Sequence, residues 1–149
     1  MNVKHNIVKL HKHKDNKPLL ININEIFAAA QSTSRDYTII HILDYKNNVV
    51  LINVKESVTH IHNLIKDIVP SIMAHTKNKN TEVLVPICQI AYVEPYFEME
   101  EIDPNEPNFY HKTLTVQRKK GKEYSKITFK SSIAPVDVNE TVQKIYNKI

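Results

Sequence analysis

At 149 residues, the chain has room for one domain, or for two small units that share a core. Its 42% hydrophobic and 24% charged residues are typical of a soluble globular protein, and its net charge of +4 is mild. A single cysteine excludes an internal disulfide. The sequence has no apolar run of about 18 residues and no apolar segment typical of a secretory signal, so we expect no membrane span and no secretion by a signal peptide.

The first half is predicted to alternate strands with polar turns. Residues 2–13 and 19–26 have the apolar and β-branched content of two strands. Residues 37–43 and 49–54 are predicted to form a hairpin across an Asn-rich turn. Ser57 can cap a following helix, whose apolar stripe ends before Pro70 and consists of Val58, Ile61, Leu64, Ile65 and Ile68.

The second half begins with comparable segments. Residues 71–77 are predicted as a strand, although the pattern is also compatible with a continued helix. Residues 83–87 and 90–93 are predicted strands, and Pro86 indicates a sheet edge or a β-bulge. Cys88 is expected to be a buried, inert thiol because it lies in an apolar strand pattern.

The last predicted elements are a hairpin and a helix. Residues 113–116 are expected to pair with residues 125–129 around a basic turn at Lys119–Lys122. Asp137 and Glu140 form a capping pattern at the start of the last helix. The apolar face of this helix is predicted to consist of Val138, Val142, Ile145 and Ile149.

The chain nearly repeats itself. Residues 20–26 match residues 84–90, an offset of 64 positions. Further along, residues 52–57 match residues 127–132, an offset of 75 positions. The growing offset predicts that the second copy carries about ten extra residues in one place.

We therefore predict an α+β fold made of two similar antiparallel β-units, each built of β-hairpins followed by a helix and packed as one pseudo-symmetric body. The units span residues 1–70 and 71–149, and the second carries an acidic-aromatic loop insertion at residues 95–110. The repeat also predicts a strand at Phe27–Ala30, where helix propensity alone favours a helix, because the corresponding Ala91–Val93 has a strand-like sequence.

Three segments of the first unit carry a family resemblance: Lys14–Ile26, Thr38–Ile42 and Val54–Val58. In these segments the chain resembles the small FlbD-like proteins and the short β-proteins common in phages of Bacteroidota, over residues 7–68. The resemblance implies a small β-rich unit with a helical end, often encoded by phages, and it carries no established enzymatic chemistry. The second unit keeps Phe129–Ser132 but lacks the Glu of the first.

No motif gathers residues for catalysis. The sequence lacks the G-x-S-x-G, glycine-rich phosphate-loop and H-E-x-x-H patterns, so we expect no enzymatic activity and no cofactor. His11 and His13 on a strand could point to one face as metal ligands, whereas His60 and His62 on a helix would diverge. Since no Cys or carboxylate partners stand at metal-ligand spacing, we expect solvated histidines and no metal site.

The acidic-aromatic insertion is the sharpest local feature. Together with Glu94, directly before it, the insertion mixes six acidic residues with large apolar side chains, a combination that suits docking to a basic, grooved protein surface. The alternative is an aromatic lid folded onto its own core. The residues predicted to bind protein are Tyr96, Phe97, Met99, Glu100, Glu101, Ile102, Asp103, Phe109 and Tyr110.

Basic residues gather near the amino terminus and near residue 120. These residues are Lys12, Lys14, Lys17, Arg118, Lys119, Lys120 and Lys122, and they could neutralise phosphates or meet the acidic loop of a neighbouring copy. The predicted function is therefore that of a non-enzymatic structural or adaptor protein of a phage virion or its assembly, in the virion or the host cytoplasm, with other proteins and copies of itself as partners. The alternative is a basic accessory protein that binds nucleic acid.

Overall fold

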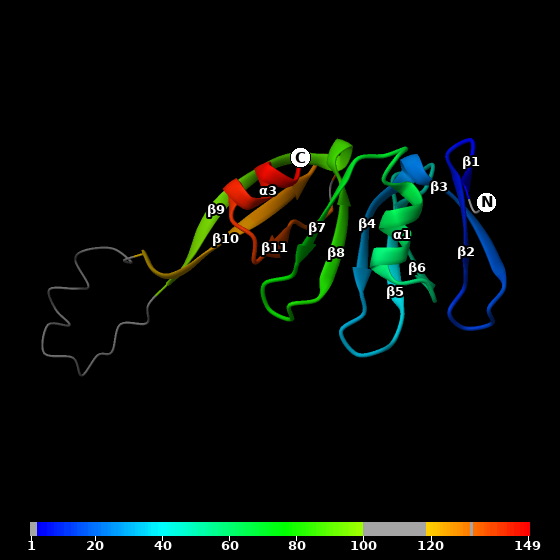
Figure 1. Cartoon of the computed structure of the whole chain (residues 1–149), viewed down its shortest axis with the longest axis horizontal. Helices are drawn as coiled ribbons and strands as arrows, with labels where there is room; N and C mark the ends of the chain where they lie inside the picture. The colour runs from blue at the N-terminus through cyan, green and yellow to red at the C-terminus, as the bar shows by residue number, and fades with distance from the viewer. Residues whose placement is uncertain (1–2, 100–118, 132) are drawn as a thin grey trace, which may run out of the picture.

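The computed structural model describes residues 3–99, 119–131 and 133–149 and shows an α+β fold of antiparallel sheets with helices (Figure 1). The first half contains β1 (Val3–Lys4), β2 (Ile7–His11), β3 (Pro18–Asn22), the one-turn 3₁₀ helix η1 (Ile23–Glu25), β4 (Ile26–Gln31), β5 (Thr38–Leu43), β6 (Val49–Val54) and α1 (Val58–Ile65). The second half contains β7 (Ser71–His75), β8 (Glu82–Pro86), η2 (Ile87–Gln89), β9 (Ile90–Met99), β10 (Lys119–Phe129), β11 (Val136–Val138) and α3 (Val142–Lys148).

The strands form three sheets within the described residues. Their orders are β1-β2-β3, β6-β5-β4-β8-β7 and β11-β10-β9. Isolated bridges between Lys12 and Val54 and between Thr76 and Val138 connect β2 to β6 and β7 to β11. The strands therefore follow one another along the long axis of the molecule, with β3 and β9 toward its opposite ends (Figure 1).

The central sheet joins the two halves of the chain. Its strand β4 comes from the first half and pairs with β8 from the second, with Ala29 opposite Leu84 and Ala30 opposite Val83. Pro86 lies at the end of β8, beyond this pairing, so it occupies neither the sheet edge nor the bulge predicted for it. A proline at a strand end removes no ladder hydrogen bond from the middle of the sheet.

Buried side chains form two core clusters. The first lies under α1 and combines strand residues of the first half with Leu84 of the second: Val8, Leu10, Ile21, Ile23, Ile26, Ala29, Ile40, Val54, Val58, Ile61, Ile65, Val69 and Leu84. The second lies under α3 and consists of Ile72, Ala74, Val83, Val85, Ile127, Phe129, Val138 and Ile145. Because burial of one such aliphatic side chain contributes about 1.5–3 kcal/mol, these clusters are the main source of stability.

Asparagine takes the place of glycine in the tight turns. Asn16, Asn47 and Asn80 adopt positive φ angles of 59°, 61° and 53°. Asn tolerates this left-handed region better than other residues with a side chain. The prediction that turns rely on polar residues near these positions is confirmed for the hairpins β2–β3, β5–β6 and β7–β8.

The start of α1 and one ambiguous strand also agree with the sequence. Ser57 caps α1 by accepting a hydrogen bond from the backbone N–H of His60 at 3.1 Å. The segment Phe27–Ala30 lies in β4, as the repeat predicted and helix propensity did not. Residues 71–75 form β7, so the continued helix is excluded there.

The predicted hairpin around Lys119–Lys122 is wrong. These residues lie within β10, which pairs with β9 and places Lys126 opposite Glu94. The predicted strand at 113–116 lies outside the described residues. The chain's only glycine, Gly121, lies in this basic stretch. Its φ is 113°, and a Cβ at this position would lie 2.8 Å from Cβ of Glu98 on β9. A glycine therefore allows β10 to pass close to β9 here.

The β4–β5 and β9–β10 ladders share one register. Ala29 lies opposite Ile40, and Val93, 64 positions after Ala29, lies opposite Ile127. The residues paired with them, Ile40 and Ile127, are 87 positions apart, whereas the sequence comparison predicted a match of Ile127 with Ile52. The chain runs 11 positions from Ala29 to Ile40 and 34 positions from Val93 to Ile127, so the connection between the paired residues is 23 residues longer in the second ladder.

Candidate functional site

Part of the segment that was predicted to be a protein-binding loop is a strand in the structure. Tyr96, Phe97 and Met99 belong to β9, so the predicted loop does not begin at residue 95. Within the described residues, β9 and β10 extend past the short β11, which pairs only with residues 125–127 (Figure 1). We call the paired segments 96–99 and 119–124 the arm. The predicted residues Glu100, Glu101, Ile102, Asp103, Phe109 and Tyr110 lie outside the described residues.

Aromatic rings and lysines gather on the arm. The rings of Tyr96 and Tyr124 stack with centroids 5.8 Å apart. Nζ of Lys126 lies 4.7 Å from the ring centroid of Tyr96, and Nζ of Lys77 lies 4.3 Å from that of Tyr124. The Tyr96 hydroxyl donates a hydrogen bond to Glu94 at 3.1 Å, and this bond raises the pKa of Tyr96. The two rings of the arm are therefore flanked by two lysines and a glutamate from just outside it.

The predicted basic residues do not form one patch. Lys12, Lys14 and Lys17 are exposed at the β2–β3 turn, whereas Lys122 is exposed on β10. These two elements lie toward opposite ends of the molecule (Figure 1). Lys119 and Lys120 belong to β10, and Arg118 lies outside the described residues. The two sets are therefore separate basic surfaces.

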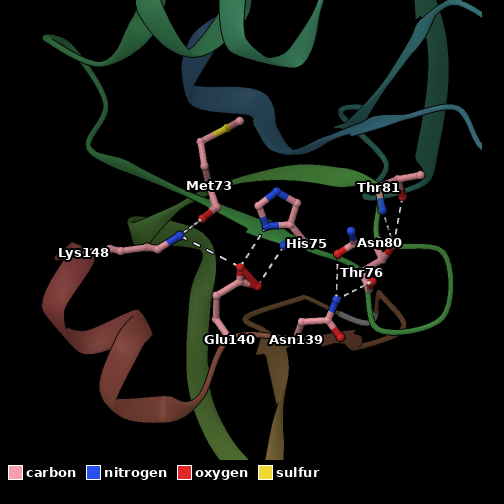
Figure 2. A network of polar contacts seen from close by, with 8 residues as sticks. All are labelled: Met73, His75, Thr76, Asn80, Thr81, Asn139, Glu140 and Lys148. Carbon is pink, nitrogen blue, oxygen red and sulfur yellow. Dashed lines mark hydrogen bonds and ion pairs between the residues drawn. The ribbon is translucent and has the colours of Figure 1, made fainter.

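A buried carboxylate links the last helix to the strand β7. Glu140 accepts a hydrogen bond from the backbone N–H of His75 at 2.9 Å and lies 3.0 Å from its Nδ1 (Figure 2). Lys148, near the end of α3, lies 4.0 Å from Glu140 and donates to the carbonyl oxygen of Met73. Thr141, directly after Glu140, caps α3 by accepting from the N–H of Lys144. Glu140 therefore helps to fix the start of the helix, but the predicted capping pattern is wrong: Asp137, the predicted cap, and Val138, predicted on the apolar face of the helix, both lie in β11.

The neighbouring turn is tied to the same segment. Asn139 donates from Nδ2 to the carbonyl oxygen of Thr76 at 3.3 Å and to Oδ1 of Asn80 at 2.9 Å (Figure 2). The hydroxyls of Thr76 and Thr81 lie 2.8 Å apart across this turn. The β7–β8 turn and the residues before α3 thus form one polar network, which we call the second lock.

The first half contains a matching lock. Glu56 accepts a hydrogen bond from the backbone N–H of His11 at 2.9 Å, and its other oxygen lies 2.7 Å from Nδ1 of His11. Thr38 adds a hydrogen bond from its hydroxyl to the carbonyl oxygen of Glu56. Ser57 then caps α1, as Thr141 caps α3. We call this network the first lock.

Both carboxylates are held in their charged form. Burial raises the pKa of Glu56, but the hydrogen bonds from His11 outweigh it, so the pKa lies below its ordinary value. The same balance holds for Glu140, where His75 supplies the hydrogen bonds and Lys148 adds an attractive charge. An ionised carboxylate that accepts two hydrogen bonds rigidifies the chain at each helix start.

Sequence reasoning missed both locks, although a signal was present. The segments Val54–Val58 and Val138–Val142 share the pattern Val-x-Glu-Ser/Thr-Val. The match is hidden because the two segments are 84 positions apart, whereas strands β2 to β4 lie 64 positions before β7 to β9. In the first lock, the imidazole of His11 contacts the carboxylate of Glu56 and is not a free metal ligand. The described part of the chain contains no group of three or more His, Cys, Asp or Glu residues that could hold a metal ion.

A cleft of about 630 Å³ lies between the β4–β5 turn, the β7–β8 turn and β11, and is lined among others by Tyr37, His41, Lys77, Lys79 and Asp137. Two buried atoms in its lining, Nδ1 of His41 and Oδ1 of Asp137, have no hydrogen-bond partner among the described residues. Burial lowers the pKa of His41, which keeps its imidazole neutral at neutral pH. The cleft can therefore offer polar groups to a small ligand.

Cys88 was predicted to be buried and inert, but it is exposed in η2. The apolar run that suggested a continuous strand is interrupted there by a turn of 3₁₀ helix. No helix in the described residues is long and apolar enough to cross a membrane. Comparison with protein-family models, with curated proteins and with solved structures found no match to this chain.

Proposed function

We propose that this chain is a non-enzymatic structural or adaptor protein of a phage particle or of its assembly, and that it binds other proteins through the arm and residues 100–110. The observation that carries this proposal is the shape of the arm: two strands without a third neighbour in the described residues, with stacked Tyr96 and Tyr124 on them. A two-stranded ribbon is marginally stable in water by itself. A partner that packs on the aromatic pair would stabilise it.

The acidic side chains on and after β9 indicate the charge expected of the partner. Residues 94–106 hold six acidic side chains, two of which, Glu94 and Glu98, lie on β9. Interfaces concentrate their binding energy in aromatic anchors, and a neighbouring segment whose charges are all acidic, such as residues 94–106, steers a basic partner. The expected partner surface is therefore a basic groove on a protein of the particle. This role would place the chain in the virion or in the host cytoplasm.

We also propose that the two halves are copies of one unit. The equal registers of β4–β5 and β9–β10, the matching His–Glu locks and the matching helix caps support this proposal. The test is the double substitution Lys55→Asn, Ser57→Thr, which gives residues 54–58 of the first lock the same sequence as residues 138–142 of the second. The exchanged protein should keep its stability within about 0.5 kcal/mol, as for neutral surface changes; a loss several times larger would show that the locks are not equivalent.

The binding proposal is tested by deleting residues 100–109. The deletion leaves the pairs between β9 and β10 intact, whereas removal of residues 95–99 would destroy β9. The deleted protein, and separately Tyr96→Ala, should stay folded by circular dichroism but lose co-sedimentation with the proteins of its source particle. Tyr45→Ala is the control, because Tyr45 is 89% exposed on the β5–β6 turn, away from the arm.

Two outcomes would contradict the binding proposal. If the deletion unfolds the protein, residues 100–109 act as a lid on its own core. If the intact protein binds DNA or RNA tightly at physiological salt, with an affinity that falls steeply as salt rises, it is a nucleic-acid-binding protein instead.

A further inference from the structure

The joint between the two halves is a strand pairing that the chain could also make with another copy of itself. At this joint, Leu84 of β8 lies opposite Ala29 of β4 and is fully buried among α1 residues that include Ile61 and Ile65. Contacts between α1 and β8 complete the joint. Edge pairing of β8 with β4 and burial of Leu84 under a helix therefore define its geometry.

Both partners of this joint have counterparts that are edge strands in the part of the chain that the structure describes. β3 precedes β8 by 64 positions, and β9 follows β4 by 64 positions. Among the described residues, β3 is the last strand of the sheet β1-β2-β3, and β9 is the last strand of β11-β10-β9. Each therefore offers backbone N–H and C=O groups along one side, and such edges are templates for pairing with another chain.

Two apolar residues that are buried at the joint have counterparts that are exposed at or near these edges. Leu20 on β3 is 68% exposed, whereas its counterpart Leu84 is 0% exposed. Ile149 after α3 is 63% exposed, whereas its counterpart Ile65 in α1 is 0% exposed. Apolar side chains are thus exposed at the positions where the internal joint buries them.

We infer that the chain associates head to tail with a second copy of itself, with β3 of one copy pairing antiparallel to β9 of the next. The register of the internal joint places Leu20 opposite Val93, and puts the Leu20 side chain against Ile145 and Ile149 of α3 in the neighbour. This inference rests on the proposed role in assembly and names the partner as the same chain. The contact differs from the arm, so the two can be tested separately.

The contact is heterologous, because its two surfaces are different parts of the molecule. Repeated head-to-tail addition gives a closed ring if the rotation between copies closes, and an open filament if it does not. The intermolecular joint is weaker than the internal one. The internal joint has a hydrogen bond from the Thr59 hydroxyl to Glu82, and the corresponding residues between copies would be Gln143 and Pro18.

The test measures the mass of the intact protein by analytical ultracentrifugation over a range of concentrations. The buffer contains a reductant because Cys88 is exposed and could form a disulfide between copies. The wild type should gain mass with concentration. Leu20→Asp should raise the Kd of association by about 30-fold or more, the effect of losing one hot-spot side chain at an interface.

Leu51→Asp is the matched control. Leu51 is a leucine of similar exposure, 58%, on β6, outside the inferred contact. It should associate as the wild type does. A wild type that stays monomeric at the highest soluble concentration, or an equal loss with Leu51→Asp, would overturn the inference.

A mixing experiment tests the head-to-tail arrangement itself. Tyr92 is 55% exposed on β9, so Tyr92→Asp damages the other surface without removing a buried side chain. Leu20→Asp retains an intact β9, and Tyr92→Asp retains an intact β3. Each variant alone should be monomeric, but an equimolar mixture should form dimers and nothing larger. A mixture that stays monomeric, with both variants folded, would refute the arrangement.

Failure of this inference can be told apart from failure of the proposed function. Deletion of residues 100–109 should abolish binding to particle proteins while self-association persists. Leu20→Asp should abolish self-association while a single copy still binds through the arm.

Discussion

Glu140 accepts a hydrogen bond from the backbone N–H of His75 and a second from its imidazole, at 2.9 and 3.0 Å. The two residues are 65 positions apart, at the start of the last helix and at the end of β7. Glu56 and His11 have the same relationship in the first half. Each pair links the residue before a helix cap to the end of a strand in the same half, β2 or β7. It therefore holds the start of the helix against that strand.

We predict that Glu140→Ala lowers the free energy of unfolding by about 1–3 kcal/mol, because the N–H and imidazole of His75 lose a buried, charged acceptor. Urea denaturation followed by circular dichroism measures this change. Glu25→Ala, at an exposed position of η1, is the control and should change stability by less than about 0.5 kcal/mol. Equal effects of the two substitutions would show that the second lock contributes nothing.

The two lowered carboxyl pKa values predict an acid-sensitive fold. A carboxyl whose pKa is lower in the folded state than in the unfolded state stabilises the fold above its unfolded pKa. That contribution is lost as the pH falls from about 5 through the folded pKa. The double variant Glu56→Gln, Glu140→Gln should therefore be less stable at pH 7, and its stability should fall less between pH 7 and acid. Parallel pH curves of the double variant and the wild type would contradict this.

Gly121→Ala should weaken the arm without unfolding the body. The φ of 113° is unfavourable for a residue with a side chain and costs on the order of 1–3 kcal/mol, and the added Cβ would press on Glu98. Hydrogen exchange should therefore become faster for amides of residues 119–124, and stay unchanged in β4, β5 and β8. Lys122→Ala, one residue away and exposed, is the control; the same acceleration in that variant would rule out the backbone explanation.

Leu84 and Leu20 should respond differently to truncation. Leu84→Ala removes a fully buried side chain and should cost about 2–5 kcal/mol, whereas Leu20→Ala should cost less than about 0.5 kcal/mol in dilute solution. Denaturation at a low protein concentration keeps association from contributing. A large loss with Leu20→Ala under these conditions would mean that β3 is buried within the monomer.

Local patterns predicted the local structure of this chain. Ser57 as a helix cap, the asparagine turns and the strand at Phe27–Ala30 each depend on a few neighbouring residues, and the structure confirms them. The locks could not be found in this way because His11 and Glu56 are 45 positions apart and only the fold brings them together. The pairing of β10 with β9 was missed for the same reason, since many residues separate the strands.

The candidate site could be predicted only in part. The segment around Tyr96 stood out by composition, and the structure places Tyr96 on the arm beside Tyr124, a neighbour that no sequence spacing indicated. The basic residues were grouped by their charge, but Lys12 follows β2 and Lys122 belongs to β10, and these strands lie toward opposite ends of the molecule (Figure 1). Composition identifies which residues are unusual; strand order decides which of them meet.

The burial of Leu84 in the first core cluster has a consequence for synthesis. The amino-terminal half cannot complete its core when α1 leaves the ribosome, because one of its buried side chains is encoded after it. Domains generally fold as units while the chain is being made. Here β4 must wait with an open edge until β8 is translated, so nascent chains that stall between residues 65 and 84 should be the most exposed to mispairing and to capture by chaperones.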